Sequence, residues 1–471
     1  MRFYLSLILL LQAFITTGQE TVPQVLSYSE YLAYVKKYHP MVRQADLQLE
    51  MGEAELLRAR GAFDPKLEVD YSRKEFKGTE YYDLLNSTFK IPTWYGLELK
   101  AGFEQNEGLY LNPERTVPPE GLFSAGISLS AAQGLIMDKR RAVLKSAKAL
   151  REQTQAERDL MVSDVLFEAS EAYLKWARLH RELEIYEGFV ANARQRFQGI
   201  SRSAATGEIA AIDTVEAGIA FQDRLLQLEQ TRVKLLKQKL EVSNFVWLEN
   251  NVPVELQPST VPDIQFLEEN RFEIGTEEWT DDFSFEEHPK LLAMEAKLKA
   301  LRIERRLKMN NLLPKVDLEY NFITPEPETV DTYDTSNYKA GLKFSFPLFL
   351  RKERGELKLA GYKLENAALE LELKRRQIQN KVDGILQELD SYLEQIRLSQ
   401  EMVENYRQLL NAEERKFSFG ESSLFLINSR ENKLIEARLK LNELLVKYLV
   451  TKAELFRSLG VPPQIPGETE M

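Results

Sequence analysis

The sequence predicts a mainly α-helical chain with a small transmembrane β part. Two long stretches, Glu120 to Val252 and Leu348 to Val461, contain no proline and are rich in helix-forming residues. Short segments in which apolar and polar residues alternate accompany each stretch, and such alternation is typical of strands. The same order of features occurs twice. We therefore expect a tandem-repeat protomer of long antiparallel coiled-coil helices with about four strands.

The composition argues against several classes of function. The 471 residues include 62 Lys and Arg against 73 Asp and Glu, a formal net charge of −11, so the chain lacks the basic excess of a nucleic-acid binder. It has no cysteine, which rules out disulfides, thiolate-bound metals, thiol catalysis and a lipid-anchored N-terminal cysteine. It has only three histidines and no HExxH, Walker-type or GxSxG motif. We expect no cofactor, no metal site and no enzymatic activity.

The N-terminus has the pattern of a secretory signal. Arg2 precedes an apolar run from Phe3 to Ile15, and Thr16 and Gly18 are small residues suited to cleavage before Gln19. We expect residues 1–18 to be a signal peptide, so that the mature chain crosses the inner membrane. No later stretch approaches the roughly 20 apolar residues of a membrane-spanning helix. Insertion into a membrane would therefore require a β-barrel.

The two proline-free stretches predict long helical hairpins. A helix from about Lys139 to Arg202 would be roughly 96 Å long, too long for a compact globule. Apolar residues in both stretches follow the three- and four-residue steps of a coiled-coil seam. Gly207 and Gly420 each mark a hairpin tip. The seam residues are Val233, Leu236, Leu240, Ser243 and Trp247 in the first stretch, and Leu434, Ala437, Leu441, Leu444 and Tyr448 in the second.

The two halves of the chain repeat each other. His39-Pro40 recurs as His288-Pro289, and Pro65 recurs as Pro314, both at an offset of 249 residues. Beyond Arg141 the offset falls to 213, which relates Gly207 to Gly420, so the first copy carries an insertion of 36 residues. We expect repeats at 19–250 and 288–460, an acidic proline-containing linker at 251–287 and a tail at 461–471.

Four segments alternate with the period of a strand. They lie near Pro65 to Tyr71, Phe123 to Ser130, Val316 to Phe322 and Ala340 to Leu348. Each has one apolar and one polar face, as a barrel wall in lipid requires, although a single strand of this kind more often covers a soluble core. The insertion adds alternating residues within 80–105. They could form a further barrel hairpin or a loop, and we favour an elaboration of the barrel end.

The order of these features resembles the outer membrane efflux protein family, the TolC-like outer membrane factors. The resemblance covers nearly the whole mature chain. Its most specific signals are the two tip segments, Gly207-Glu-Ile-Ala-Ala-Ile-Asp213 and Phe417-Ser-Phe-Gly420-Glu-Ser-Ser-Leu-Phe-Leu-Ile-Asn-Ser-Arg-Glu431. These match the family pattern of an aromatic residue, a glycine, small polar residues and a restarting helix.

The resemblance implies a homotrimer in the outer membrane of a Gram-negative bacterium. Its protomers would pool four strands each into one 12-stranded barrel, continued by a helical tunnel across the periplasm. It further implies a periplasmic adaptor and an inner-membrane pump as partners, in a tripartite efflux or type I secretion system, with cargo choice left mainly to the pump. Independently, four strands cannot close a barrel, because about eight is the smallest number that does. Copies of the chain must therefore pair their open edges.

The resemblance also implies a site at the tips. Acidic residues six positions after the tip glycine help to close the tunnel in relatives, and Asp213 occupies that position, with Glu216 one turn later. In the second copy the position holds Leu426. Arg202 and Arg430 could be latch partners across the aperture. A solvated helix start explains the acids equally well, and both arginines could be ordinary surface residues.

The tip of the second repeat offers contact candidates for the adaptor. Leu424, Phe425 and Ile427 could face the adaptor or pack within the hairpin. The glycines of both tips are expected to supply a positive φ. A non-transporting periplasmic coiled-coil scaffold is the alternative function, and a hydrolase of envelope polymers would rest only on the abundant carboxylates.

Overall fold

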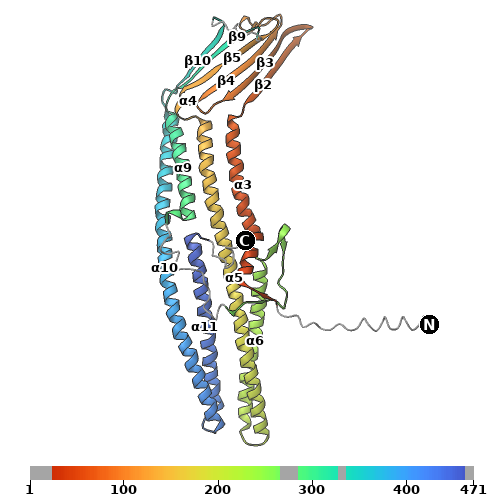
Figure 1. The fold of residues 1–471 in the computed structure, drawn as a ribbon, viewed down its shortest axis with the longest axis vertical. Helices are drawn as coiled ribbons and strands as arrows, with labels where there is room; N and C mark the ends of the chain where they lie inside the picture. Colours follow the sequence, from red (N-terminus) through yellow and green to blue (C-terminus); the bar gives the residue numbers. More distant parts are fainter. Residues whose placement is uncertain (1–23, 266–284, 327–335, 462–471) are drawn as a thin grey trace, which may run out of the picture. The chain divides into compact units, whose positions relative to one another are not determined.

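The chain follows the same course twice. In each half, a helix leads into strands, and a very long helix follows the strands. After a tight turn, a second helix runs back along the long one (Figure 1). The helices α3 and α9 begin at Pro40 and Pro289, and the returning helices α6 and α11 begin at Ala211 and Leu424. The helices are α2 (Tyr28–Tyr38), α3 (Pro40–Arg60), α4 (Gln133–Ile136), α5 (Lys139–Ala205), α6 (Ala211–Ser243), α9 (Pro289–Asn310), α10 (Arg351–Ser418) and α11 (Leu424–Leu459).

The computed structural model describes residues 24–265, 285–326 and 336–461. The expected signal peptide, most of the expected tail and part of the expected linker lie outside these residues. The chain divides into two compact units. One, called here the sheet unit, comprises residues 44–160 and 284–379, and the other, the hairpin unit, comprises residues 1–43, 161–283 and 380–471. The long helices α5 and α10 contribute to both units.

The sheet unit contains one antiparallel sheet of six strands in the order β10-β9-β5-β4-β3-β2 (Figure 1). The four expected strands are present, but the strand number of about four was wrong. Residues 80–105, for which we favoured an elaboration of the barrel end, form two full strands that lie in the sheet between β2 and β5. The strands are β2 (Lys66–Phe76), β3 (Thr79–Pro92), β4 (Leu97–Glu107), β5 (Leu122–Ala132), β9 (Lys315–Thr324) and β10 (Tyr338–Ser345).

The sheet has one apolar and one polar face. Strand register brings residues of one kind opposite each other, for example Phe89 opposite Ala101 and Lys90 opposite Lys100, so the alternation of every strand is in phase with its neighbours. The apolar face carries Leu67 and Val69 of β2, Phe89 and Ile91 of β3, Leu99 and Phe103 of β4, Phe123 and Ile127 of β5, Leu318 and Tyr320 of β9, and Leu342 and Phe344 of β10.

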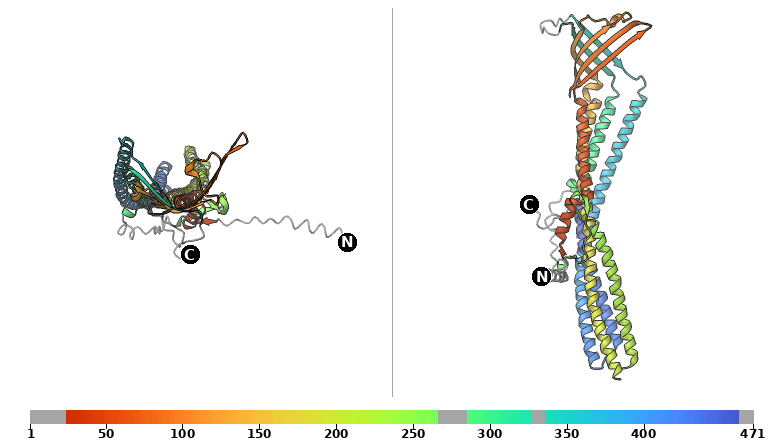
Figure 2. Two further views of the ribbon diagram at one scale, coloured as in Figure 1. Left: turned by 90° about the horizontal axis from the view of Figure 1, so that it is seen from above. Right: turned by 90° about the vertical axis from the view of Figure 1, so that its right-hand side faces the viewer.

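The polar face is the concave one. Lys339 of β10 donates to Glu104 of β4 at 2.9 Å, although two strands lie between them, so the side chains converge on this face. Gly126 lies at the crowded centre, where a Cβ atom would collide with the backbone of β9. Exposed apolar residues such as Leu342 (69% exposed) therefore lie on the convex face. A convex apolar face and a concave polar face are the arrangement of a membrane barrel wall. Figure 2 shows the strands of this sheet running obliquely.

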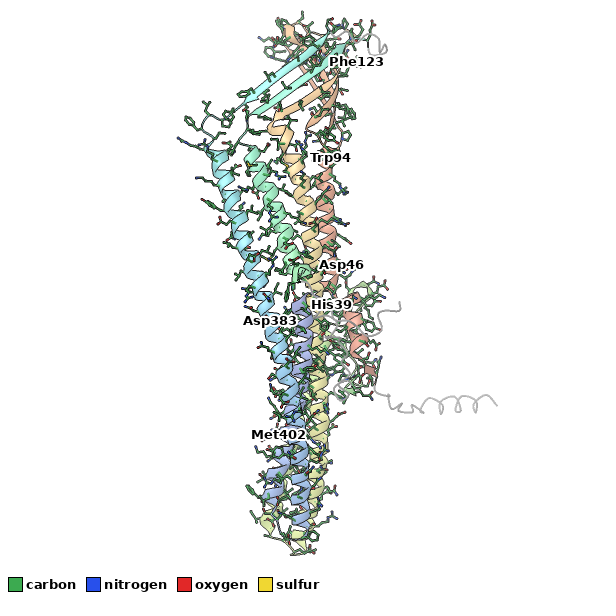
Figure 3. All side chains as sticks on the ribbon, turned by 60° about the vertical axis from the view of Figure 1, so that its left-hand side comes forward. His39, Asp46, Trp94, Phe123, Asp383 and Met402 are labelled. Atoms are coloured by element: carbon green, nitrogen blue, oxygen red, sulfur yellow. The ribbon has the colours of Figure 1, made fainter. Side chains whose placement is uncertain are left out.

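Aromatic residues lie at both ends of the strands. Trp94, in the turn between β3 and β4, stacks on Phe63 with ring centroids 4.2 Å apart. At the other end of the sheet Phe103 and Phe123 approach to 4.7 Å. Figure 3 marks Trp94 and Phe123 at these two levels. Aromatic girdles at the two rims are typical of barrels in lipid.

The hairpin unit is built around α5, α6, α10 and α11. A core cluster joins Phe189 of α5, Val403 and Leu410 of α10, and Ile427 and Leu434 of α11. The predicted seam of α11 is buried here, with Leu434 and Leu444 exposed by only 3% and 4%. In the predicted seam of α6, Val233, Leu236 and Leu240 are exposed, whereas Ser243 is buried.

Hydrogen bonds hold the start of the linker and the N-terminal segment against this unit. Buried Lys239 of α6 donates to the carbonyls of Pro258 and Thr260 at 2.9 and 2.8 Å. Tyr173 of α5 donates to the carbonyl of Leu26 at 2.6 Å, and its oxygen accepts a bond from the amide of Asp263 at 3.1 Å. The short strands are β1 (Val25–Leu26) paired with β8 (Val261–Pro262), and β6 (Trp247–Leu248) paired with β7 (Val252–Pro253); short 3-10 helices cover Gly61–Phe63, Pro113–Arg115, Glu249–Asn251 and Phe285–Glu287.

Helices α3 and α9 begin in the same way. The Nδ1 atom of His39 accepts the amide of Met41 at 3.3 Å, and Nδ1 of His288 accepts the amide of Lys290 at 3.0 Å. Each imidazole thus satisfies an amide that the first turn leaves unbonded, and the proline after it is favoured at the first helical position. Within the described residues, no helix has the length and apolarity needed to cross a membrane.

The predicted fold class, a mainly helical tandem repeat of long antiparallel hairpins with a small sheet, is confirmed.

Candidate functional site

The two hairpin tips share one backbone geometry. Gly207 and Gly420 have φ angles of 78° and 76°, in the left-handed region that glycine adopts without strain. After each glycine, an amide bonds back to the helix end: Glu208 to the carbonyl of Ser203, and Glu421 to that of Lys416, both at 3.0 Å. These are Schellman-type ends of α5 and α10. The role of both glycines is therefore to adopt the backbone conformation that the turn requires.

The returning helices begin differently. Ser423 caps α11 through its hydroxyl, which accepts the amide of Leu426. Ala210 precedes α6 and offers no side-chain cap, and Asp213 is the acidic residue of the first turn. A carboxylate there is favoured by the positive end of the helix dipole. Asp213 is half-buried, and it occupies the same position in its helix as Leu426 does in α11.

Glu216 joins the two hairpins. Its carboxylate accepts a hydrogen bond from the side-chain amide of Asn428 of α11 at 3.3 Å. Next to it, Ala217 packs in a cluster with Ile200 and Leu424. The second turn of α6 is thus held against α11 within one chain.

In the part of the chain that the structure describes, neither Arg202 nor Arg430 forms a hydrogen bond or an ion pair with Asp213 or Glu216. Arg202 is exposed and donates to the carbonyl of Gln198 in its own helix at 3.2 Å. Arg430 lies 3.7 Å from Glu413, which also accepts the hydroxyl of Ser422 at 2.6 Å. Arg430 therefore braces the α10–α11 hairpin in this chain. A latch across an aperture between copies stays a proposal.

The apolar tip residues face different environments. Leu424 and Ile427 are exposed by only 3% and 2% and pack between the helices. Phe425 is 68% exposed, and Phe419 in the turn is 79% exposed. The placement favours internal packing for Leu424 and Ile427, and it leaves the two phenylalanines as the apolar groups presented outward by this tip.

A buried ionic cluster above the tips escaped the sequence analysis. Glu431 of α11, only 2% exposed, lies 2.7 Å from Arg196 of α5 and 3.4 Å from Arg224 of α6. Arg224 also donates to the side chain of Asn432. The cluster ties three helices together. Its signal in the sequence was a charge on an apolar face: Glu431 lies between Ile427 and Leu434 in the helical repeat.

Helix α6 presents an apolar stripe to solvent. The predicted seam residues Val233, Leu236 and Leu240 are 55%, 60% and 52% exposed. Towards the tip the stripe continues through Ile219 and Ile212, at 61% and 69%. An apolar stripe with coiled-coil spacing that no described residue of the same chain covers is typical of an interaction surface.

The described residues contain no group of three or more His, Asp or Glu side chains arranged to hold a metal ion. His39 stacks on Phe245 with centroids 5.6 Å apart and faces the edge of Trp247. Burial lowers the pKa of His39, against the opposing effect of a hydrogen bond with the backbone of Asn244. Its role in the structure is that of a helix cap.

Comparison with known proteins agrees with this architecture. Residues 284–461 match the outer membrane efflux protein family. No curated protein sequence matches the chain.

Solved outer-membrane channels share the fold. The CmeC outer membrane channel of Campylobacter jejuni superposes with a TM-score of 0.64 at 12% identity, over 93% of this chain and 86% of that one. The outer membrane protein VceC of Vibrio cholerae superposes with a TM-score of 0.63 at 14% identity, over 92% of this chain and 96% of that one. The open state of the Neisseria gonorrhoeae MtrE outer membrane channel superposes with a TM-score of 0.64 at 11% identity, over 94% of this chain and 90% of that one. These matches show that the chain shares the fold of these channels. The resemblance to the outer membrane efflux protein family is thus confirmed: residues 284–461 match that family in sequence, and the chain has the fold of solved outer-membrane channels.

Proposed function

We propose that this chain is the protomer of an outer-membrane conduit, which passes solutes from the periplasm to the exterior and performs no chemistry itself. One observation carries the proposal: the sheet is apolar on its convex face, polar on its concave face, and open at both edges. Lipid can cover the first face and water the second. A six-stranded sheet cannot close by itself, so copies of the chain complete the wall.

The assembly we propose is a homotrimer. The exposed stripe of α6 supports association of copies through the helices, in addition to the strands, because a coiled-coil seam needs a facing helix. Closed rings of like subunits use one heterologous contact repeated around an axis. The number three comes from the resemblance to the efflux family.

The conduit would require energy from elsewhere. We propose a periplasmic adaptor that docks at the hairpin tips and an inner-membrane pump behind it, as a tripartite efflux or type I secretion system. The exposed Phe419 and Phe425 support a docking role for the second tip, because exposed aromatic side chains are suited to protein contacts. Asp213 and Glu216 would line the periplasmic aperture, with Arg202 and Arg430 near it.

The proposed processing and layout follow the sequence. Residues 1–18 would be removed on export, leaving a mature chain with repeats at 19–250 and 288–460 joined by the linker at 251–287. The strands would lie in outer-membrane lipid and the hairpins in the periplasm, and no lipid anchor would be needed.

Cell fractionation tests the proposal against a scaffold function. A conduit should sediment with outer membranes and migrate in detergent gels as an oligomer that dissociates on heating. Reconstituted in planar bilayers, it should give stepwise ionic conductance. Recovery in the soluble periplasmic fraction would support the scaffold, and a membrane-bound oligomer without conductance would contradict transport.

A further inference from the structure

We infer that β10 of one copy pairs directly with β2 of the next, and that the inserted hairpin β3–β4 is part of the lipid-facing wall, so that a ring of three copies has eighteen strands. This inference rests on the proposed trimer. It replaces the four strands per copy that the resemblance implied. Its consequence is a barrel half as wide again as one of twelve strands, because diameter grows about linearly with strand number.

The first step is that β3 and β4 are built as wall strands. Their apolar residues share the convex face with those of β2 and β5: Phe103 lies opposite Phe123, and Phe89 opposite Leu67. Their charged residues lie on the concave face, where Lys90 pairs with Glu68 and Lys100 lies 3.1 Å from Glu319. An external flap would not need one face to be apolar in phase with the neighbouring strands.

The second step concerns the two edges. Every residue of β2 and β10 is exposed, and in the described part of the chain each strand has only one neighbour. Long exposed edges with apolar residues are templates for pairing with another chain. Because six antiparallel strands per copy is an even number, β10 and the β2 of the next copy run in opposite directions, and the antiparallel order continues across the junction.

The third step fixes the register. Residues directly opposite in an antiparallel pair lie on the same face, so apolar residues of β10 must meet apolar residues of β2. Both Lys66 and Ser345 lie at the helix end of their strands. When Ser345 is placed opposite Lys66 of the next copy, Leu342 lies opposite Val69 of that copy, and Lys343 lies opposite its Glu68. Apolar side chains then face apolar side chains across the junction, and the Lys343 ammonium faces the Glu68 carboxylate.

Disulfide trapping tests the junction. The chain has no cysteine, so Val69→Cys with Leu342→Cys introduces the only thiols. Opposite residues of an antiparallel pair have Cα atoms about 4.5 to 5.5 Å apart, within disulfide range. Mild oxidation of outer membranes should convert the protomer to a covalent trimer, whereas each single variant should not. Val69→Cys with Gly341→Cys is the matched control, because those side chains point to opposite faces.

Thiol labelling tests the inserted hairpin. In single variants along β4, a membrane-impermeant maleimide should label Lys100→Cys and Glu104→Cys, and it should leave Leu99→Cys and Phe103→Cys unlabelled. If the hairpin lies outside the wall, neighbouring positions will label alike, and the eighteen-strand wall is wrong. An outer-membrane oligomer without the 69–342 disulfide would overturn the junction. Absence of any oligomer would instead overturn the proposed function, and this inference with it.

Discussion

At the scale of residues, His39 shows how a buried imidazole can make stability depend on pH. Its neutral Nδ1 accepts the amide of Met41, and burial lowers its pKa below the ordinary value of about 6.5. The unfolded chain therefore takes up this proton more readily than the folded one. The stability that the neutral side chain provides is present above pH of about 6.5, and it is lost as the pH falls through the folded pKa.

We predict that His39→Asn weakens this pH dependence. Asparagine keeps an acceptor for the cap but does not titrate. Between about pH 7.5 and about pH 5.5, the thermal unfolding midpoint should fall less in the variant than in the wild type. The remaining ionisable groups are common to both proteins, so the difference isolates His39. Equal falls would contradict this role.

The buried cluster around Glu431 gives the largest expected effect of a single substitution. Glu431→Gln leaves Arg196 and Arg224 near each other without the carboxylate between them. Breaking such a buried pair should cost about 3 kcal/mol, measured as a lower midpoint of thermal unfolding. The control is Glu394→Gln, whose partner Arg397 is exposed, and it should change the midpoint far less because solvent screens that pair. Similar effects for both variants would refute the structural role of the cluster.

The aperture acids make a separate prediction. If Asp213 and Glu216 line the closed end of the tunnel, replacing both with alanine should raise single-channel conductance in planar bilayers. Glu229→Ala, an exposed acid farther along α6, should leave conductance unchanged. An unaltered conductance in the double variant would remove both acids from the aperture.

Sequence reasoning located the tip glycines because two copies at one offset fix equivalent positions. It missed the pairing of Arg430 with Glu413 and the ionic cluster of Glu431. Both depend on which helices pack together, and the order of helices in a bundle is not encoded in the periodicity of any one of them.

At the scale of elements, the two predicted seams have different environments. Leu434 and Leu444 of the α11 seam are buried in their own chain, whereas Val233, Leu236 and Leu240 of the α6 seam are exposed and only its last helical residue, Ser243, is buried. Periodicity alone predicted both seams and could not distinguish them, because a seam facing another copy has the same spacing as an internal one.

We predict that the α6 seam holds copies together. Leu236→Gln with Leu240→Gln should abolish the heat-dissociable oligomer in detergent gels, because the stripe loses the apolar area that it buries on association. Lys234→Gln with Lys237→Gln, on the same exposed part of α6, is the matched control and should retain the oligomer. Survival of the oligomer in the seam variant would show that α6 is not an interface.

Strands were predicted where alternation is strict, and four of the six were recognised. Residues 80–105 also alternate, but their place in the sheet depends on pairing with β2 and β5. The pairing of β4 with β5 joins residues separated by a long connection, whereas β2 and β3 are joined by the two-residue turn of Lys77 and Gly78, a local hairpin signal that sequence reasoning missed. The matched polar and apolar faces became visible only with the register in hand.

At the scale of the whole molecule, the proposed functional unit is a ring of copies. Among the residues that the structure describes, nothing pairs with the outer edges of β2 and β10, and nothing covers the apolar stripe of α6. In a single chain, unpaired strand edges and an exposed apolar stripe favour aggregation. A closed ring of copies pairs the edges and covers the stripe. Four strands per copy already implied this need at the sequence level, and six strands leave it in place while widening the wall.

Electron cryomicroscopy of the protein, extracted from outer membranes into lipid nanodiscs, tests this claim most directly. We expect several copies around an open axis, with Leu342 and the other convex residues toward lipid and Glu104 toward a water-filled lumen. A particle made of one chain, or a sheet whose apolar face is turned toward a closed protein interior, would contradict it.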